Sequence, residues 1–273
     1  MVRSDEFFLK RWVEYYGSAV GPQNLYVYFD GLDQSVPSFC EGINAVVVPH
    51  IEGNVHTADR GRIDFLSARA EELFERYDCV IGTDVDEFLC PDPALGIGLA
   101  EYLSQRSPRG RNAAVSALGV DVGQKMPLEG AIDPSRGMLQ QRRFAKLSTR
   151  YSKSSALYRK AAWGSGFHHV RGSNFHIEKD LYLLHFGCVD MDMLKAKMAD
   201  KVLSEAGWER HLRKRAGTIR LVSSARRALP LDRVKGVARF MQNCLRPPYA
   251  PGKPAMLELK IVVEIPPRFK DIV

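Results

Sequence analysis

The 273-residue sequence lacks a long hydrophobic run, and no window approaches the roughly 18 consecutive apolar residues that a membrane-spanning helix needs. The first residues also lack the apolar stretch of a secretory signal peptide. The five cysteines are scattered without C-x-x-C spacing, which indicates reduced thiols and argues against a zinc site built on cysteine pairs. With 45% hydrophobic residues, we expect a cytoplasmic globular protein with an ordinary core.

Several functional signatures are missing as well. The histidines form no H-x-H or H-E-x-x-H motif, so a metallohydrolase that uses His168, His169, His185 and the aspartates lacks the compact ligand spacing typical of that class. No recognisable nucleic-acid module and no internal repeat is present, and we expect no nucleic-acid partner.

The charge is unevenly distributed. The net charge is +7, and the stretch from Trp208 to Phe240 holds ten Lys/Arg residues against two acidic ones. Such a segment indicates an anionic partner or, alternatively, a solvated helix face. Further on, four prolines follow one another closely: Pro247, Pro248, Pro251 and Pro254. The sequence therefore predicts a main domain over residues 1–206 and a basic helical, then proline-rich, extension over 207–273.

Hydrophobic periodicity predicts an alternation of helices and strands in the first 90 residues, which is typical of a parallel α/β sheet flanked by helices. Residues 121–162 show little periodicity. The predicted helices are 5–19, 59–77, 97–106 and 191–202, and the predicted strands are 25–29, 45–48, 78–82, 113–120 and 181–186.

The most informative stretch contains Asp84 and Asp86, which directly follow the apolar pair Val80-Ile81. Alternate residues of a strand share a face, so both carboxylates can address one ion. A hard cation such as Mg²⁺ or Mn²⁺ prefers oxygen ligands and is often shared with a diphosphate. The alternative is a solvated turn or a pair of helix caps, although Phe88-Leu89 argues against a fully exposed loop.

Further polar residues stand at predicted strand ends or in glycine-rich loops. Asp30 and Asp33 follow the strand at 25–29, where they could contact a nucleoside or merely form an Asp-Gly turn. His168 and His169 are adjacent, so in a strand at most one would face a site. His185 lies between apolar residues, where a histidine is usually a packed core residue.

Four segments together resemble the bacterial family 2-like glycosyltransferases with a D-x-D-E-F signature. They are Arg3–Trp12 with Tyr15-Tyr16, Tyr26–Asp33, Asp84–Leu89 and Leu184–Phe186, and the resemblance spans roughly residues 1–200. The Asp-x-Asp-Glu-Phe segment is its most specific motif. The opening departs from the family pattern, with Ser4-Asp5 where Asn-Glu is usual and Tyr16 where histidine is common.

The resemblance implies a GT-A fold, which is Rossmann-like, and transfer of a sugar from a nucleotide-sugar to a hydroxyl acceptor. The expected donor is a UDP-linked sugar, the acceptor a glycan or a lipid-linked molecule, and the cofactor Mn²⁺ or Mg²⁺. It also implies roles for individual residues: Asp84, Asp86 and His185 at the metal, and Asp30, Asp84 and Asp86 at the nucleotide, which Asp33 could also contact. If the reaction inverts, a carboxylate or histidine must take the acceptor proton, and the candidates are Glu87, Asp121 and His168.

The rival hypothesis is a non-enzymatic anion-binding protein whose basic carboxyl-terminal segment binds nucleic acid or a membrane surface. It predicts salt-dependent binding that does not need Asp84 or Asp86. The basic segment also fits the enzyme hypothesis, because peripheral contact with an anionic inner membrane face would bring a glycan-building enzyme to lipid-linked acceptors.

Overall fold

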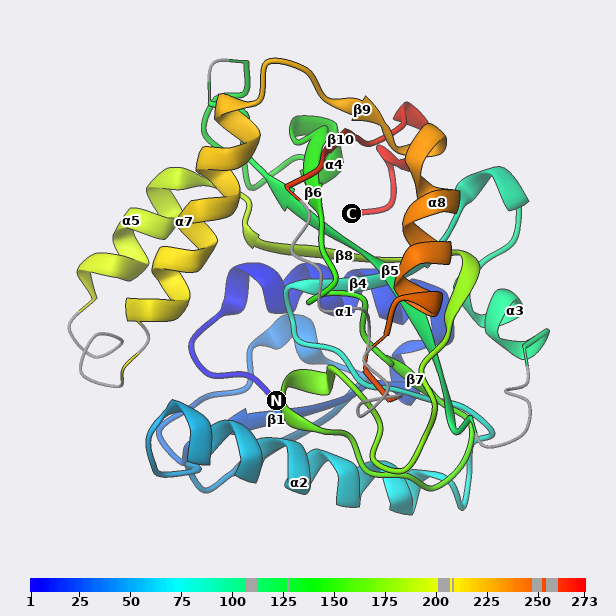
Figure 1. The fold of residues 1–273 in the computed structure, drawn as a ribbon. Helices are drawn as coiled ribbons and strands as arrows, with labels where there is room; N and C mark the ends of the chain where they lie inside the picture. Colours follow the sequence, from blue (N-terminus) through cyan, green and yellow to red (C-terminus); the bar gives the residue numbers. More distant parts are fainter. Residues whose placement is uncertain (107–111, 127, 201–206, 208, 247–251, 254–259) are drawn as a thin grey trace.

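The computed structural model describes residues 1–106, 112–126, 128–200, 207, 209–246, 252–253 and 260–273. The chain is mixed α/β, with a large sheet covered by helices and a separate two-stranded parallel sheet beside it (Figure 1). The predicted α/β class with flanking helices is therefore confirmed. The four prolines from 247 to 254 lie outside the described residues, as do the last two residues of the helix predicted over 191–202.

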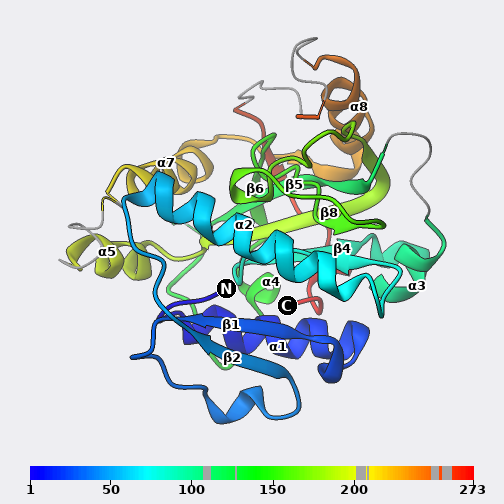
Figure 2. The ribbon, with the colours of Figure 1, turned by 90° about the horizontal axis from the view of Figure 1, so that it is seen from below.

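The amino-terminal part contains α1 (Glu6–Val20), β1 (Tyr26–Asp30), β2 (Asn44–Val48) and α2 (Val55–Leu73). β1 and β2 pair in parallel over five residues, and Figure 2 shows this pair with α1 as a layer apart from the central strands. α2 starts earlier than predicted because the Asn54 side chain accepts hydrogen bonds from the main-chain N–H groups of His56 and Thr57. This is a standard N-cap, and periodicity alone did not reveal it.

The large sheet is mostly antiparallel, so the prediction of a mostly parallel sheet is wrong. Its two longest strands, β5 and β8, pair in parallel, but β4 with β8, β6 and β7 with β5, and β10 with β6 pair antiparallel. The strands are β3 (Val80–Ile81), β4 (Glu87–Pro91), β5 (Ala114–Gly123), β6 (Phe144–Leu147), β7 (Ala156–Leu157), β8 (Ile177–Cys188), β9 (Leu229–Pro230) and β10 (Val262–Glu264).

The error has a physical cause in residues 121–162, whose weak periodicity hid two strands. β6 and β7 lie in this stretch and return along β5 in the opposite direction. Parallel pairing requires a long crossover connection, whereas antiparallel neighbours need only a loop. Short irregular segments therefore built an antiparallel sheet where the first 90 residues had indicated a parallel one.

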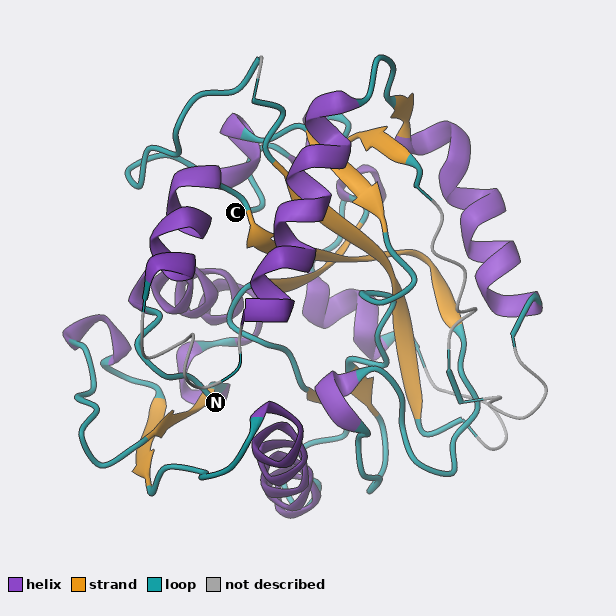
Figure 3. Cartoon of the chain, turned by 60° about the vertical axis from the view of Figure 1, so that its left-hand side comes forward, coloured by secondary structure: helices purple, strands orange, loops and turns teal. Residues whose placement is uncertain are grey.

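The remaining helices lie around this sheet, as Figure 3 shows. They are α3 (Leu99–Ser104), α4 (Met138–Gln141), α5 (Met191–Ala199), α7 (Glu209–Ser224) and α8 (Leu231–Cys244), with 3-10 turns at Pro22–Asn24, Ser38–Cys40, Pro93–Leu95, Ser165–Phe167 and Pro267–Phe269. α5 and α7 lie side by side (Figure 1) and bury a shared apolar cluster around Leu194, Leu212 and Ile219. This contact places one face of α7 against the sheet, where it reaches the site described below.

The predicted carboxyl-terminal extension adds elements to the same sheet. β10 pairs with β6, and β9 pairs with β10. The buried Asp92, at the end of β4, accepts hydrogen bonds from Arg268 and from Lys235 of α8. Among the described helices, none has both the length and the apolar character needed to cross a bilayer.

Candidate metal centre

Four polar residues form one row across the large sheet. Glu87 of β4 is paired with His185 of β8, His185 with Asp121 of β5, and Asp121 with Lys146 of β6. Residues directly opposite each other on paired strands point to the same face and have neighbouring side chains. The strand order thus brings together residues from positions 87, 121, 146 and 185, which we call the cross-strand row.

A candidate metal site lies at the acidic end of the row. Asp86, Glu87 and His185 are buried, and each offers one ligand atom such that these atoms all lie within 4.8 Å of one another. Two carboxylates and an imidazole are a donor set that Mn²⁺ or Mg²⁺ can share with substrate oxygens. The predicted ligands Asp86 and His185 are therefore adjacent, and Glu87 joins them.

The imidazole of His185 is held from its other side. Its Nδ1 lies 2.6 Å from Oδ1 of Asp121, and its Nε2 lies 3.4 Å from Oδ2 of Asp86. Thr218 of α7 donates to the second oxygen of Asp121 at 2.7 Å, and the ring of Tyr151 stacks on the imidazole at 3.6 Å between centroids. A carboxylate on one ring nitrogen is the usual support for a metal-binding histidine, so these residues fit a divalent cation at Nε2.

The same two carboxylates, of Asp86 and Asp121, also determine the charge of the His185 ring. Burial by itself disfavours the charged imidazolium, but the carboxylates of Asp86 and Asp121 outweigh this effect and raise the pKa of His185 to about 9. Without a cation the ring is thus protonated and pairs with both carboxylates.

Asp84 lies outside this group because two cations hold it. Arg62 of α2 donates to Oδ1 of Asp84 at 2.6 Å, and Lys153 donates to Oδ2 at 3.1 Å. Burial alone would raise the pKa of Asp84, but Arg62 and Lys153 together hold it well below its usual range. Lys153 also lies 2.5 Å from Oε1 of Glu87, and both side chains are almost completely buried, at 3% and 1% exposure.

The two aspartates after β1 differ in their surroundings. Asp30 accepts a hydrogen bond from the main-chain N–H of Ile51 and lies 3.0 Å from Nδ1 of His50. Burial lowers the pKa of the Met1 amino group to about 5, and the charges of Asp84 and Asp30 act against this effect. Asp33 instead forms a bidentate pair with Arg3 at the surface, where 62% of its side chain is exposed.

The two adjacent histidines also lie in different environments. His168 is near Lys153, Arg150 and Asp84, and burial together with the Lys153 charge lowers its pKa to about 3. His169 is influenced instead by Lys253 and Arg171, and burial lowers its pKa as well. Only His168 therefore borders the acidic cluster.

Several site residues were missed by sequence reasoning. Lys153 and Tyr151 lie in the stretch without periodicity, and Arg62 was one of several polar residues on a predicted helix. Arg215, with a guanidinium nitrogen 3.3 Å from Oδ2 of Asp86, and Thr218 were read only as part of the basic segment. The positive charge of that segment was the one sequence feature that pointed to Arg215, and it did not show which of the segment's basic residues contacts the carboxylates.

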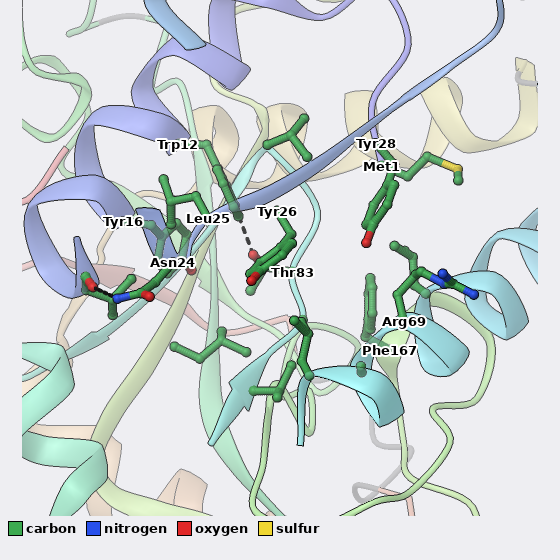
Figure 4. A pocket seen from close by; sticks show the side chains of 18 of the residues that line it. Met1, Trp12, Tyr16, Asn24, Leu25, Tyr26, Tyr28, Arg69, Thr83 and Phe167 are labelled. Atoms are coloured by element: carbon green, nitrogen blue, oxygen red, sulfur yellow. Dashed lines mark hydrogen bonds between the residues drawn. The ribbon is translucent and has the colours of Figure 1, made fainter. Parts of the chain in front are cut away.

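Two cavities flank this region. One, of about 220 Å³, lies between β1, α2 and β3 and is lined by aromatic side chains, among them Trp12, whose indole N–H donates to Thr83 (Figure 4). The other, of about 470 Å³, is bordered by Asp121, the segment 146–151 and α7. Its wall therefore includes two members of the row, Asp121 and Lys146, together with residues of α7 such as Thr218, which donates a hydrogen bond to Asp121.

Comparison with protein-family models and with curated proteins gives no match for this chain. The resemblance to family 2-like glycosyltransferases therefore stays a prediction from the sequence motifs.

Proposed function

We propose that this protein is a metal-dependent glycosyltransferase of GT-A type that moves a sugar from a nucleotide-sugar, with a UDP-linked sugar as the expected donor, to a hydroxyl group of a glycan or lipid-linked acceptor. The observation that carries the proposal is the buried group of Asp86, Glu87 and His185, in which the second aspartate and the glutamate of the D-x-D-E-F motif meet a histidine of β8. Buried carboxylates beside a histidine and a cavity are costly for folding and are therefore typical of functional sites.

Asp86, Glu87 and His185 would hold the cation. When bound, a divalent cation supplies positive charge that stabilises the diphosphate as it leaves. Arg215, which contacts Asp86, adds a further positive charge at this point. Asp30 ends β1, and its charge and that of Asp84 both act on the Met1 amino group; we assign the nucleoside to these two carboxylates.

The reaction requires a group that takes the acceptor proton as the hydroxyl oxygen bonds to the anomeric carbon and the bond to the diphosphate breaks. Of the three candidates, Glu87 is enclosed with Lys153, and His168 borders Asp84. Asp121 lines the larger cavity. We therefore assign the proton-accepting role on the acceptor side to Asp121.

The test is thermal stability with Mn²⁺ and a panel of nucleoside diphosphates, for the wild type and Asp86→Ala. A ligand that binds only the folded state raises the melting temperature by mass action. We expect a rise of about 2–4 °C that requires both the metal and one nucleotide.

Asp192→Ala is the matched control, because Asp192 is an exposed carboxylate on α5. The rise should persist in Asp192→Ala and disappear in Asp86→Ala. Absence of a shift with every metal–nucleotide pair would contradict the proposal and favour an anion-binding protein without transferase activity.

A further inference from the structure

The larger cavity is unusually basic for a pocket beside a carboxylate cluster. Its wall includes five cationic side chains from three parts of the chain, and its single carboxylate is Asp121. The cations are Lys146, Arg150, Lys214, Arg215 and Lys260. A cavity of about 470 Å³ also has the size of a site for a small molecule.

The carboxylate of Asp121 does little to neutralise this charge. One of its oxygens faces His185, and the other accepts the hydrogen bond from Thr218. Within the part of the chain that the structure describes, neither Lys146 nor Lys260 has a carboxylate within ion-pair distance. Lys146 is paired with Asp121 across β5 and β6, so it stands at the cationic end of the row that begins at the candidate metal centre.

We infer that this cavity binds the acidic group, a carboxylate or phosphate, of an anionic acceptor sugar. Cationic side chains that converge on a concave, partly desolvated surface recognise such groups through charge-assisted hydrogen bonds. Asp121 lies in the same wall, and we place the reacting hydroxyl of the sugar beside it. The words acceptor and sugar rest on the proposed function, whereas recognition of an anionic group by the cations does not.

The residues assigned to the donor do not line this cavity. Asp30, Asp84 and Asp86 are absent from its wall, and Arg215, which lines the cavity, contacts Asp86. A transferase needs two substrate sites that meet at the reacting atom. Asp121, in the cavity wall, contacts His185, and His185 contacts Asp86, so the cavity adjoins the candidate metal centre without sharing the donor carboxylates.

The test is calorimetric binding of trigalacturonate and of its trimethyl ester to the full chain, without metal or nucleotide. The two sugars have the same backbone, but the ester carries no charge. We expect the wild type to bind the acid and not the ester. The double variant Lys146→Gln/Lys260→Gln should weaken binding of the acid about tenfold, which corresponds to the loss of charge-assisted contacts.

Lys270→Gln is the matched control, because Lys270 is an exposed lysine outside the cavity wall. Its affinity for trigalacturonate should equal that of the wild type, and all three proteins should melt at the same temperature. Equal affinity for the acid and the ester, or an unchanged affinity in the double variant, would overturn the inference.

A competition experiment separates this inference from the proposed function. Displacement of trigalacturonate by UDP and Mn²⁺ would show that the cavity holds donor phosphates, and it would overturn an acceptor role. Simultaneous binding supports two separate subsites. Binding of trigalacturonate is measured without nucleotide, so its result does not depend on the nucleotide test. If no nucleotide binds, the transferase proposal fails. The trigalacturonate measurement would still show whether the cavity binds an anionic group.

Discussion

His185 on β8 and Asp121 on β5 face each other across a parallel strand pair, with Nδ1 and Oδ1 2.6 Å apart. This contact fixes the plane of the imidazole and directs Nε2 toward Asp86. Since Thr218 holds the second oxygen of Asp121, the support of the candidate metal centre extends from the sheet to α7.

Asp121→Asn should therefore weaken Mn²⁺ binding by about 10- to 100-fold, as is usual for loss of the carboxylate behind a metal-binding histidine. Electron paramagnetic resonance of free Mn²⁺ measures this affinity directly. Asp192→Asn, at an exposed site on α5, is the control and should bind as the wild type does. An unchanged affinity in Asp121→Asn would show that Asp121 does not support the metal site.

The two aspartates of the motif should behave differently in the same measurement. We expect Asp86→Asn to abolish Mn²⁺ binding, because Asp86 belongs to the group of close ligand atoms. Asp84→Asn should retain an affinity within about threefold of the wild type, since Asp84 is already paired with Arg62 and Lys153. Equal losses in both variants would show that Asp84 is a metal ligand.

Lys153→Met should destabilise the fold strongly. It removes the buried counter-charge of both Asp84 and Glu87, and breaking a buried ion pair in this way costs about 3–5 kcal/mol. Urea unfolding measures the change. The control Lys195→Met removes an exposed lysine that pairs with Asp192 three residues earlier, and it should cost less than about 1 kcal/mol. A loss of similar size in both variants would contradict this account.

Acid stability should depend on Asp92. Burial would raise the pKa of this carboxyl, but Arg268 and Lys235 hold it well below its usual range. A group whose folded pKa is lowered stabilises the protein above its unfolded pKa of about 3.9, and this contribution is lost as the pH falls through the folded value.

We therefore expect the wild type to lose about 1–2 kcal/mol more than Asp92→Asn between pH 5 and pH 2. Arg268 keeps its contact with Asp232 in the variant, and Lys235 keeps its contact with Asp180, so neither cation is left without a partner. Unfolding curves measured across this pH range test the expectation, and identical pH profiles for the two proteins would contradict it.

Gly119→Ala should destabilise the protein by about 3 kcal/mol. A Cβ at this position of β5 would overlap the main chain of Ser148, Tyr151 and Ser152, which cannot yield as a flexible side chain does. Displacing this segment also moves Tyr151 off His185. Gly236→Ala on α8 meets no atom within 4 Å and should instead stabilise the helix by up to about 1 kcal/mol. Thermal unfolding should show a lower melting temperature for Gly119→Ala and an equal or higher one for Gly236→Ala.

The sequence by itself determined the helices and strands whose hydrophobic residues repeat with a regular helical or strand period. α1, β1 and β2 lie within a residue or so of their predicted limits, and β8 contains the predicted strand at 181–186. The acidic motif was also evident, because charged residues that directly follow an apolar strand are visible without any tertiary information.

Only the tertiary structure decided which of these residues meet. Strand pairing is a long-range choice, so the row from Glu87 to Lys146 and the partnership of His185 with Asp121 could not follow from spacing. The same applies to Lys153, which reaches Asp84 and Glu87 from the stretch without periodicity. Local hydrophobic patterns set each element, whereas the order in which the strands pair sets which charges become neighbours.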